Sequence, residues 1–177
     1  MHVKVEVILF RLENGLKWRR IEGSILTYEH PDETALRLSL VSLDWNEPYH
    51  GMCHSTSWRY DTDHVVLTYA ILPDPDLSLP CFPLGNIIAA SDDPLRPSPP
   101  HLKQEDVAVH ALHHIAALSQ RDPTVRKQVE KYPELWGAVL QTSKAIDTIA
   151  ESDSNKDLPE NYHVSQEQPE KVFRKEV

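Results

Sequence analysis

The stretch "VKVEVILFRLENGLKWRRI", residues 3–21, predicts the first part of the fold. Apolar and polar side chains alternate over residues 3–9, which is the period-2 pattern of a strand with one buried face. The motif "ENG" follows, and its glycine, Gly15, can adopt the positive φ that a tight turn needs. Residues 16–21 are therefore expected to return as the second strand of an antiparallel hairpin.

A second hairpin is predicted over residues 52–72, where "MCHSTSWR" and "HVVLTYAIL" flank the polar turn "YDTD". Both arms are rich in β-branched and aromatic residues. Because the second arm is apolar on both faces, we expect this pair at the centre of the sheet.

A helix is predicted between the two hairpins, over "HPDETALRLSLVSL" at residues 30–43, after a short third strand at residues 24–28. Pro31 suits the first helical position, and the acids Asp32 and Glu33 suit the first turn, where the helix dipole favours negative charge.

The second half of the chain is expected to be a proline-rich connector followed by helices. Eight of the fourteen prolines lie between Pro73 and Pro100, which excludes regular helix or a central strand there. The connector, residues 73–104, should wrap the sheet, with a short strand at residues 86–90. Helices are expected over residues 104–120, 123–131 and 133–150, since each carries an apolar stripe or a proline start.

These patterns predict an α+β domain that includes the connector. A helical C-terminal extension over residues 121–151 should pack on it. The tail, residues 152–177, has mixed charge and almost no apolar repeat, so we expect it to be disordered.

Composition excludes several classes of function. Eighteen basic against twenty-seven acidic residues give a formal charge of -9, which repels nucleic acid. No apolar stretch is long enough to span a membrane, and the N-terminus does not resemble a signal peptide. The two cysteines, Cys53 and Cys81, are too few for a disulfide framework. We therefore expect a cytoplasmic protein without nucleic-acid or membrane partners and without a cofactor.

Residues 23–45, "GSILTYEHPDETALRLSLVSLDW", resemble the signature of the Nudix hydrolases. That signature has a Gly, five residues, a Glu, seven residues, then Arg-Glu and further glutamates, closed by a Gly. Gly23, Glu29 and Arg37 stand at these spacings, and the preceding hairpin looks like the family's opening hairpin. The resemblance covers about residues 1–120 and implies a Nudix-like α+β domain there, a mixed sheet with flanking helices.

The departures from the signature concern its metal-binding glutamates. In the family these lie at i, i+3 and i+4 on one helical face, where they hold a divalent cation against a diphosphate. The corresponding residues here are Leu38, Val41 and Ser42, and Asp44 replaces the closing Gly. We therefore expect no hydrolysis of nucleoside diphosphates by the usual Mg²⁺ route, no catalytic residue of that type and no metal site there. Glu29 and Arg37 are expected to pair and to support a ligand-binding loop.

Two other groups of residues are candidate sites. In residues 53–61, "CHSTSWRYD", His54, Ser55, Trp58 and Arg59 could line a ligand pocket with hydrogen-bond donors and a stacking surface. Ordinary cross-strand pairing explains the same residues.

In "HALHH", His110 and His114 share a helical face at a spacing that metal sites use. A third ligand would have to come from His54, His64, Cys53 or an acid of the connector. The alternative interpretation makes both histidines edge residues of an amphipathic helix.

The leading hypothesis is a non-catalytic Nudix-like domain that binds a small-molecule or nucleotide-like ligand, or another protein. The alternative is a metal-dependent hydrolase using His110 and His114. A third possibility is a purely structural protein whose proline-rich connector and apolar helices dock another subunit. A homodimer is compatible with all three.

Overall fold

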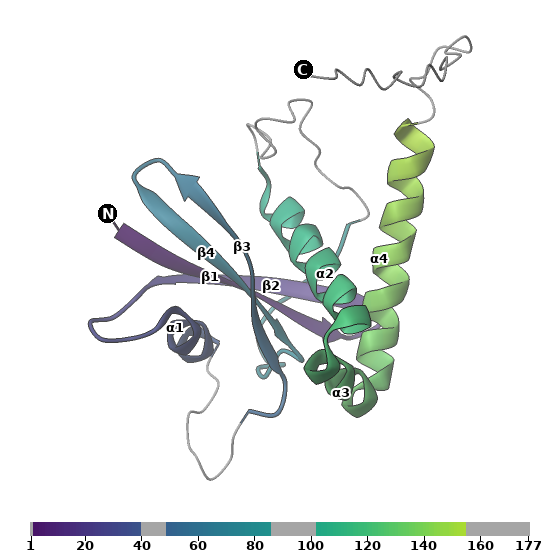
Figure 1. Cartoon of the computed structure of the whole chain (residues 1–177), viewed down its shortest axis with the longest axis horizontal. Coiled ribbons are helices and arrows are strands. Elements are labelled where there is room, and N and C mark those ends of the chain that lie inside the picture. The colour runs from purple at the N-terminus through teal and green to yellow at the C-terminus, as the bar shows by residue number, and fades with distance from the viewer. Residues whose placement is uncertain (1, 40–48, 86–101, 155–177) are drawn as a thin grey trace, which may run out of the picture.

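The computed structural model describes residues 2–39, 49–85 and 102–154. A mixed β-sheet with helices on both faces confirms the predicted α+β class (Figure 1). In chain order the elements are β1 (His2–Leu12), β2 (Leu16–Ser24), α1 (Pro31–Leu38), β3 (Met52–Asp61), β4 (His64–Leu72), β5 (Phe82–Pro83), α2 (Gln104–Arg121), α3 (Pro123–Lys131) and α4 (Pro133–Ser154).

Two antiparallel hairpins joined side by side make up most of the sheet, whose strand order is β3-β4-β1-β2-β5. Both predicted hairpins are present, and Asn14, Gly15 and Thr62 take positive φ in their turns. The seam between the hairpins is the parallel pair β1–β4. The expectation that the second hairpin is central was wrong for β3, which lies at the sheet edge. Since β1 is buried from Val5 to Arg11, it takes the central position beside β4.

The two faces of the sheet carry separate cores. On one face Ile8 and Phe10 pack with buried residues of α2, α3 and α4. On the other face Val5, Val7 and Leu9 pack with Ala35 of α1. Figure 1 shows α1 on the side of the sheet opposite α2 and α4. The alternation of side chains along β1 therefore sends successive residues into different layers.

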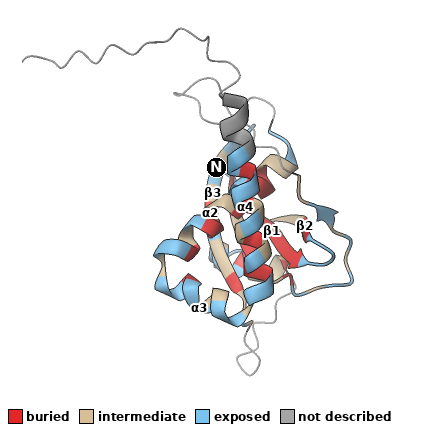
Figure 2. Cartoon of the chain, turned by 90° about the vertical axis from the view of Figure 1, so that its right-hand side faces the viewer, coloured by how far each residue is buried: buried red, intermediate tan, exposed pale blue. Residues whose placement is uncertain are grey.

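Helix α4 belongs to the core. Trp136, Val139 and Ile146 are almost completely buried in the cluster formed with α2 and the sheet. Exposed residues cover the outward side of the helix (Figure 2). The helix continues to Ser154, past the expected end, and the tail from residue 155 lies outside the described residues.

Two local predictions differ from the structure, and a third falls outside the described residues. Residues 25–30 form a turn and not a strand, with Tyr28 at φ 70° and fully exposed. Helix α1 ends at Leu38, with the Ser39 hydroxyl donating to the Ala35 carbonyl at 2.7 Å. A short strand occurs at β5, whereas the expected strand at residues 86–90 lies outside the described part of the chain.

Among the helices of the described residues, none combines the length and the apolar character required to cross a membrane.

Candidate functional site

Glu29 and Arg37, two of the predicted ligand-binding residues, lie in direct contact. Arg37 donates from Nε to Glu29 Oε1 at 2.7 Å and from Nη2 to Oε2 at 2.9 Å. The Thr34 hydroxyl and the Leu26 amide also donate to Glu29 Oε2. The hydrogen bonds from Arg37 and Thr34 lower the pKa of Glu29 to about 2. The carboxylate therefore closes the loop before α1, with both of its oxygens engaged.

Leu38 and Gly23 are packed together at the other end of this segment. A Cβ added to Gly23 would lie 2.6 Å from Leu38 Cδ2. Leu38 is partly buried and packs against the apolar cluster beneath α1. An apolar contact thus occupies the first position where the Nudix resemblance expects a metal-binding glutamate. The next substituted positions, Val41, Ser42 and Asp44, lie outside the described residues.

Strand β3 divides its four candidate ligand residues between two faces. The pairing with β4 shifts register between Ser55 and Ser57, which marks a β-bulge. His54 pairs with Ala70 and Arg59 with Val66, on the face that α2 covers. Ser55 and Trp58 pair with Tyr69 and Leu67, on the opposite face. Alternation alone would put Trp58 on the face of His54 and Arg59 on the face of Ser55, and the bulge exchanges these two residues between the faces. The imidazole and the indole that were expected to line one pocket are therefore on opposite faces.

The histidines of α2 have different surroundings. The ring of His114 stacks on His54 of β3, with centroids 5.5 Å apart and planes at 27°. Burial and the nearby His54 and His110 lower the pKa of His114. His110 is exposed. In residues 2–39, 49–85 and 102–154, no group of three His, Cys, Asp or Glu side chains is placed to hold a metal ion. Ring lone pairs lie in the ring planes, so stacked imidazoles do not aim at a shared metal.

A buried carboxylate, Glu6, holds a polar network that the sequence patterns did not identify. It accepts hydrogen bonds from Arg20 of β2, Arg59 of β3 and the Thr68 hydroxyl of β4. Burial raises the pKa of Glu6, but the bonds from Arg59 and Arg20 outweigh this effect and the pKa lies below its ordinary value. One feature of the sequence could have revealed this network: Glu6 stands in the middle of an apolar strand, and a fully buried acid needs charged or hydrogen-bonding partners.

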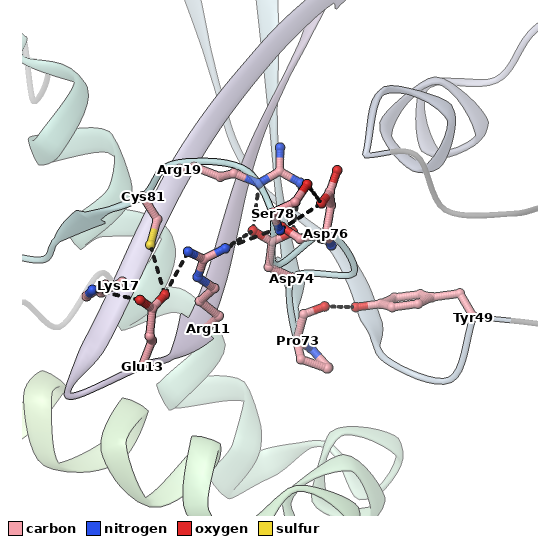
Figure 3. A network of polar contacts seen from close by, with 10 residues as sticks. All are labelled: Arg11, Glu13, Lys17, Arg19, Tyr49, Pro73, Asp74, Asp76, Ser78 and Cys81. Carbon is pink, nitrogen blue, oxygen red and sulfur yellow. Dashed lines mark hydrogen bonds and ion pairs between the residues drawn. The ribbon is translucent and has the colours of Figure 1, made fainter.

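A second buried ion pair joins β2 to the segment that follows β4. Arg19 donates from Nε and Nη2 to the two oxygens of Asp74, at 2.6 and 2.7 Å. Arg11 lies beside this pair and bonds to the Asp76 carbonyl and to Glu13 (Figure 3). The guanidinium groups of Arg11 and Arg19 are both paired with carboxylates of this chain. The network fixes the chain as it leaves the sheet toward β5.

A groove of about 770 Å³ lies beside β2, where β5 and the first turn of α2 approach it. Its walls combine the aromatic pair Trp18 and Phe82, whose ring centroids are 6.2 Å apart, with aliphatic and polar side chains. The lining residues are Trp18, Arg19, Arg20, Ile21, Leu79, Pro80, Phe82, Pro83, Gln104 and Glu105. A groove of this size can hold a ligand of drug size or a short peptide. None of the predicted site residues lines it.

No family model, curated protein or solved structure matches this chain.

Proposed function

We propose that this protein is a non-catalytic binding domain of Nudix-like architecture, and that it does not cleave nucleoside diphosphates by a Mg²⁺-dependent route. The contact between Leu38 and Gly23 carries the proposal. A hydrocarbon side chain packed on the glycine offers no oxygen to a hard cation, and Mg²⁺ at diphosphates is held through carboxylates.

The state of Glu29 supports the same conclusion. Its two oxygens accept bonds from Arg37, Thr34 and the Leu26 amide, all within the loop and α1. A metal would have to displace Arg37 to reach this carboxylate. The role of Glu29 is therefore to hold the loop before α1 in its conformation. The segment retains a Nudix-like outline without the usual metal ligands.

Binding is assigned to the groove beside β2. It brings aromatic surface together with charged side chains of the sheet and of α2, the combination that ligand sites use for affinity and orientation. The free thiols of Cys53 and Cys81 fit the reducing environment of the cytoplasm, which we assign as its location.

A diphosphatase assay tests the proposal directly. The full chain is incubated with a panel of nucleoside diphosphate compounds in Mg²⁺ or Mn²⁺, and phosphate or nucleotide release is measured. We expect no turnover above the buffer rate. Metal-dependent turnover that disappears in Glu29→Gln would overturn the proposal, because it would make Glu29 a working ligand.

Stoichiometric zinc or iron in the purified protein, lost in His110→Ala, would instead favour the histidine hydrolase.

A further inference from the structure

Among the strands that the structure describes, none pairs with the outer edge of β2 along most of its length. β5 pairs with β2 only at Lys17 and Trp18. Beyond Trp18, no strand of the described residues covers that side of β2, up to its end at Ser24. Such an edge presents backbone donors and acceptors to an incoming strand. The groove lies along this edge, since Arg19, Arg20 and Ile21 line it.

The direction of the free backbone groups follows from one hydrogen bond. Leu84 donates its amide to the Leu16 carbonyl, so the Leu16 backbone points toward β5. The register of β2 with β1 is unbroken from Leu16 to Ser24. Because the pointing direction alternates along a strand, Arg20 and Glu22 also direct N–H and C=O outward. The two residues therefore offer two N–H donors and two C=O acceptors to a strand that lies in the groove.

One buried donor beside the groove has no acceptor among the residues that the structure describes. Trp18 lines the groove and is only 6% exposed, and none of the described residues accepts a hydrogen bond from its indole Nε1. A buried N–H without an acceptor costs stability, so an acceptor brought to this part of the groove would be favourable.

The side chains around the groove indicate what kind of strand fits. Leu79, Pro80 and Phe82 form an apolar wall, and Phe82 is 60% exposed. Glu105 places a carboxylate at the end formed by α2, and the whole chain carries a formal charge of -9. The cations Arg19 and Arg20 are bound to Asp74 and Glu6. Apolar and basic side chains therefore complement this groove, while acidic ones do not.

We propose that the groove beside β2 binds an extended segment of a partner protein, with alternating apolar and basic residues, as an added strand on the edge at Arg20 and Glu22. The inference rests on the proposed binding function and names its class of partner. Main-chain hydrogen bonds to the edge supply affinity, and the apolar wall with Glu105 supplies selectivity.

The probe is a fluorescent peptide, acetyl-Val-Lys-Val-Lys-Val-Lys-amide, titrated with the full chain and followed by fluorescence anisotropy. We expect saturable binding, and a peptide with Glu in place of Lys should bind at least about tenfold more weakly. Equal binding of the two peptides would overturn the charge assignment.

Two variants at one position test the backbone pairing. Glu22→Pro removes an outward N–H, and a proline is tolerated at a strand edge when its nitrogen faces outward. Glu22→Ala removes the same side chain but retains the donor. We expect Glu22→Pro to weaken binding at least about tenfold, and Glu22→Ala to retain it. Equal binding by the two variants would overturn the added-strand geometry.

A measurement on the peptide does not depend on how the variants fold. N-methylation of all Val or of all Lys residues blocks opposite edges of the peptide strand. We expect one of these peptides to bind and the other to fail, since only one edge faces β2. Binding by both would exclude strand pairing. Phe82→Ala, an exposed position, should also weaken binding several-fold by removing part of the apolar wall.

A second copy of the chain is the competing occupant. Sedimentation would then reveal a dimer that Glu22→Pro disrupts, together with no peptide binding, and this result would overturn the inference. Peptide results leave the diphosphatase assay unaffected. A protein without turnover and without peptide binding contradicts only the added strand, whereas Glu29-dependent turnover contradicts only the proposed function.

Discussion

Arg59 on β3 reaches across β4 to the Glu6 carboxylate on β1, with Nη2 donating to Oε1 at 3.0 Å. The bond ties the sheet edge to its centre. Arg20 approaches the same carboxylate from β2 on the other side. Glu6 is thus the shared anion of two cations that come from different hairpins.

Replacing Glu6 should destabilise the fold strongly. Glu6→Ala leaves Arg20 and Arg59 without their buried partner, and removal of one member of such a group costs ~3–5 kcal/mol of unfolding free energy. Urea unfolding monitored by circular dichroism measures the loss. Glu22→Ala is the matched control, because Glu22 lies at the partly exposed rim of the network, where an ion pair contributes at most ~1 kcal/mol. Equal losses in the two variants would contradict this role for Glu6.

The contact between Gly23 and Leu38 should appear as energetic coupling. Gly23→Ala places a methyl group against Leu38 Cδ2, and we expect it to cost ~1 kcal/mol, because a flexible leucine can move aside. In a Leu38→Ala background the same substitution should cost less, since the obstructing atoms are gone. A double-mutant cycle from urea unfolding gives the coupling energy. Additive effects would mean that the methyl group added at position 23 and the Leu38 side chain do not constrain each other.

Acid titration should show that the pKa of Glu29 lies below that of an ordinary glutamate. Because Arg37 and Thr34 lower the pKa of Glu29 to about 2, its contribution to stability is present above the ordinary value of 4.5 and is lost as pH falls toward 2. Carboxyl chemical shifts in NMR should give a midpoint near 2. In Arg37→Gln the midpoint should rise toward 4.5, and an unchanged midpoint would show that Arg37 is not the cause.

Mild acid should weaken the packing of α2 on β3. The pKa of His114 is lowered from 6.5 by burial and by His54 and His110, so the unfolded chain binds its proton at a higher pH than the folded chain. Stability is therefore lost as pH falls below 6.5, until the folded protein is protonated too. Thermal unfolding between pH 7.5 and about 5 measures this loss. His114→Phe retains an aromatic ring without the charge and should reduce the pH dependence of stability. If the pH dependence of this variant were unchanged, groups other than His114 would be its cause.

Local patterns predicted most of the secondary structure. The alternation in β1 and β2 and the prolines at 31, 123 and 133 act within a few residues, and the corresponding elements begin as expected. The bulge between Ser55 and Ser57 was not predictable from alternation, because a one-residue register shift depends on the pairing with β4. It put Trp58 on the face of Ser55 and Arg59 on the face of His54, the reverse of what alternation predicts.

The site was less predictable than the fold because its parts come from distant segments. The groove combines β2 with residues around β5 and with the start of α2, and Arg19 meets Asp74 across 55 positions of the sequence. No local spacing encodes such contacts. The pairing of Glu29 with Arg37 could be predicted from the sequence, because the two residues are only eight positions apart, across one helix start.

The parallel pairing of β1 with β4 also constrains how the chain folds. Each hairpin closes over a short loop and can form early, but His2 lies opposite His64, so the seam must join segments about sixty residues apart. Closing such a loop costs entropy before its contacts form, and folds with distant pairings are slow to assemble. During synthesis on the ribosome, β1 and β2 emerge first. The edge of β1 that pairs with β4 then stays unpaired until the chain up to Leu72 has also emerged. The rate of docking along this single seam then decides how long the apolar edge of β1 is exposed to other chains.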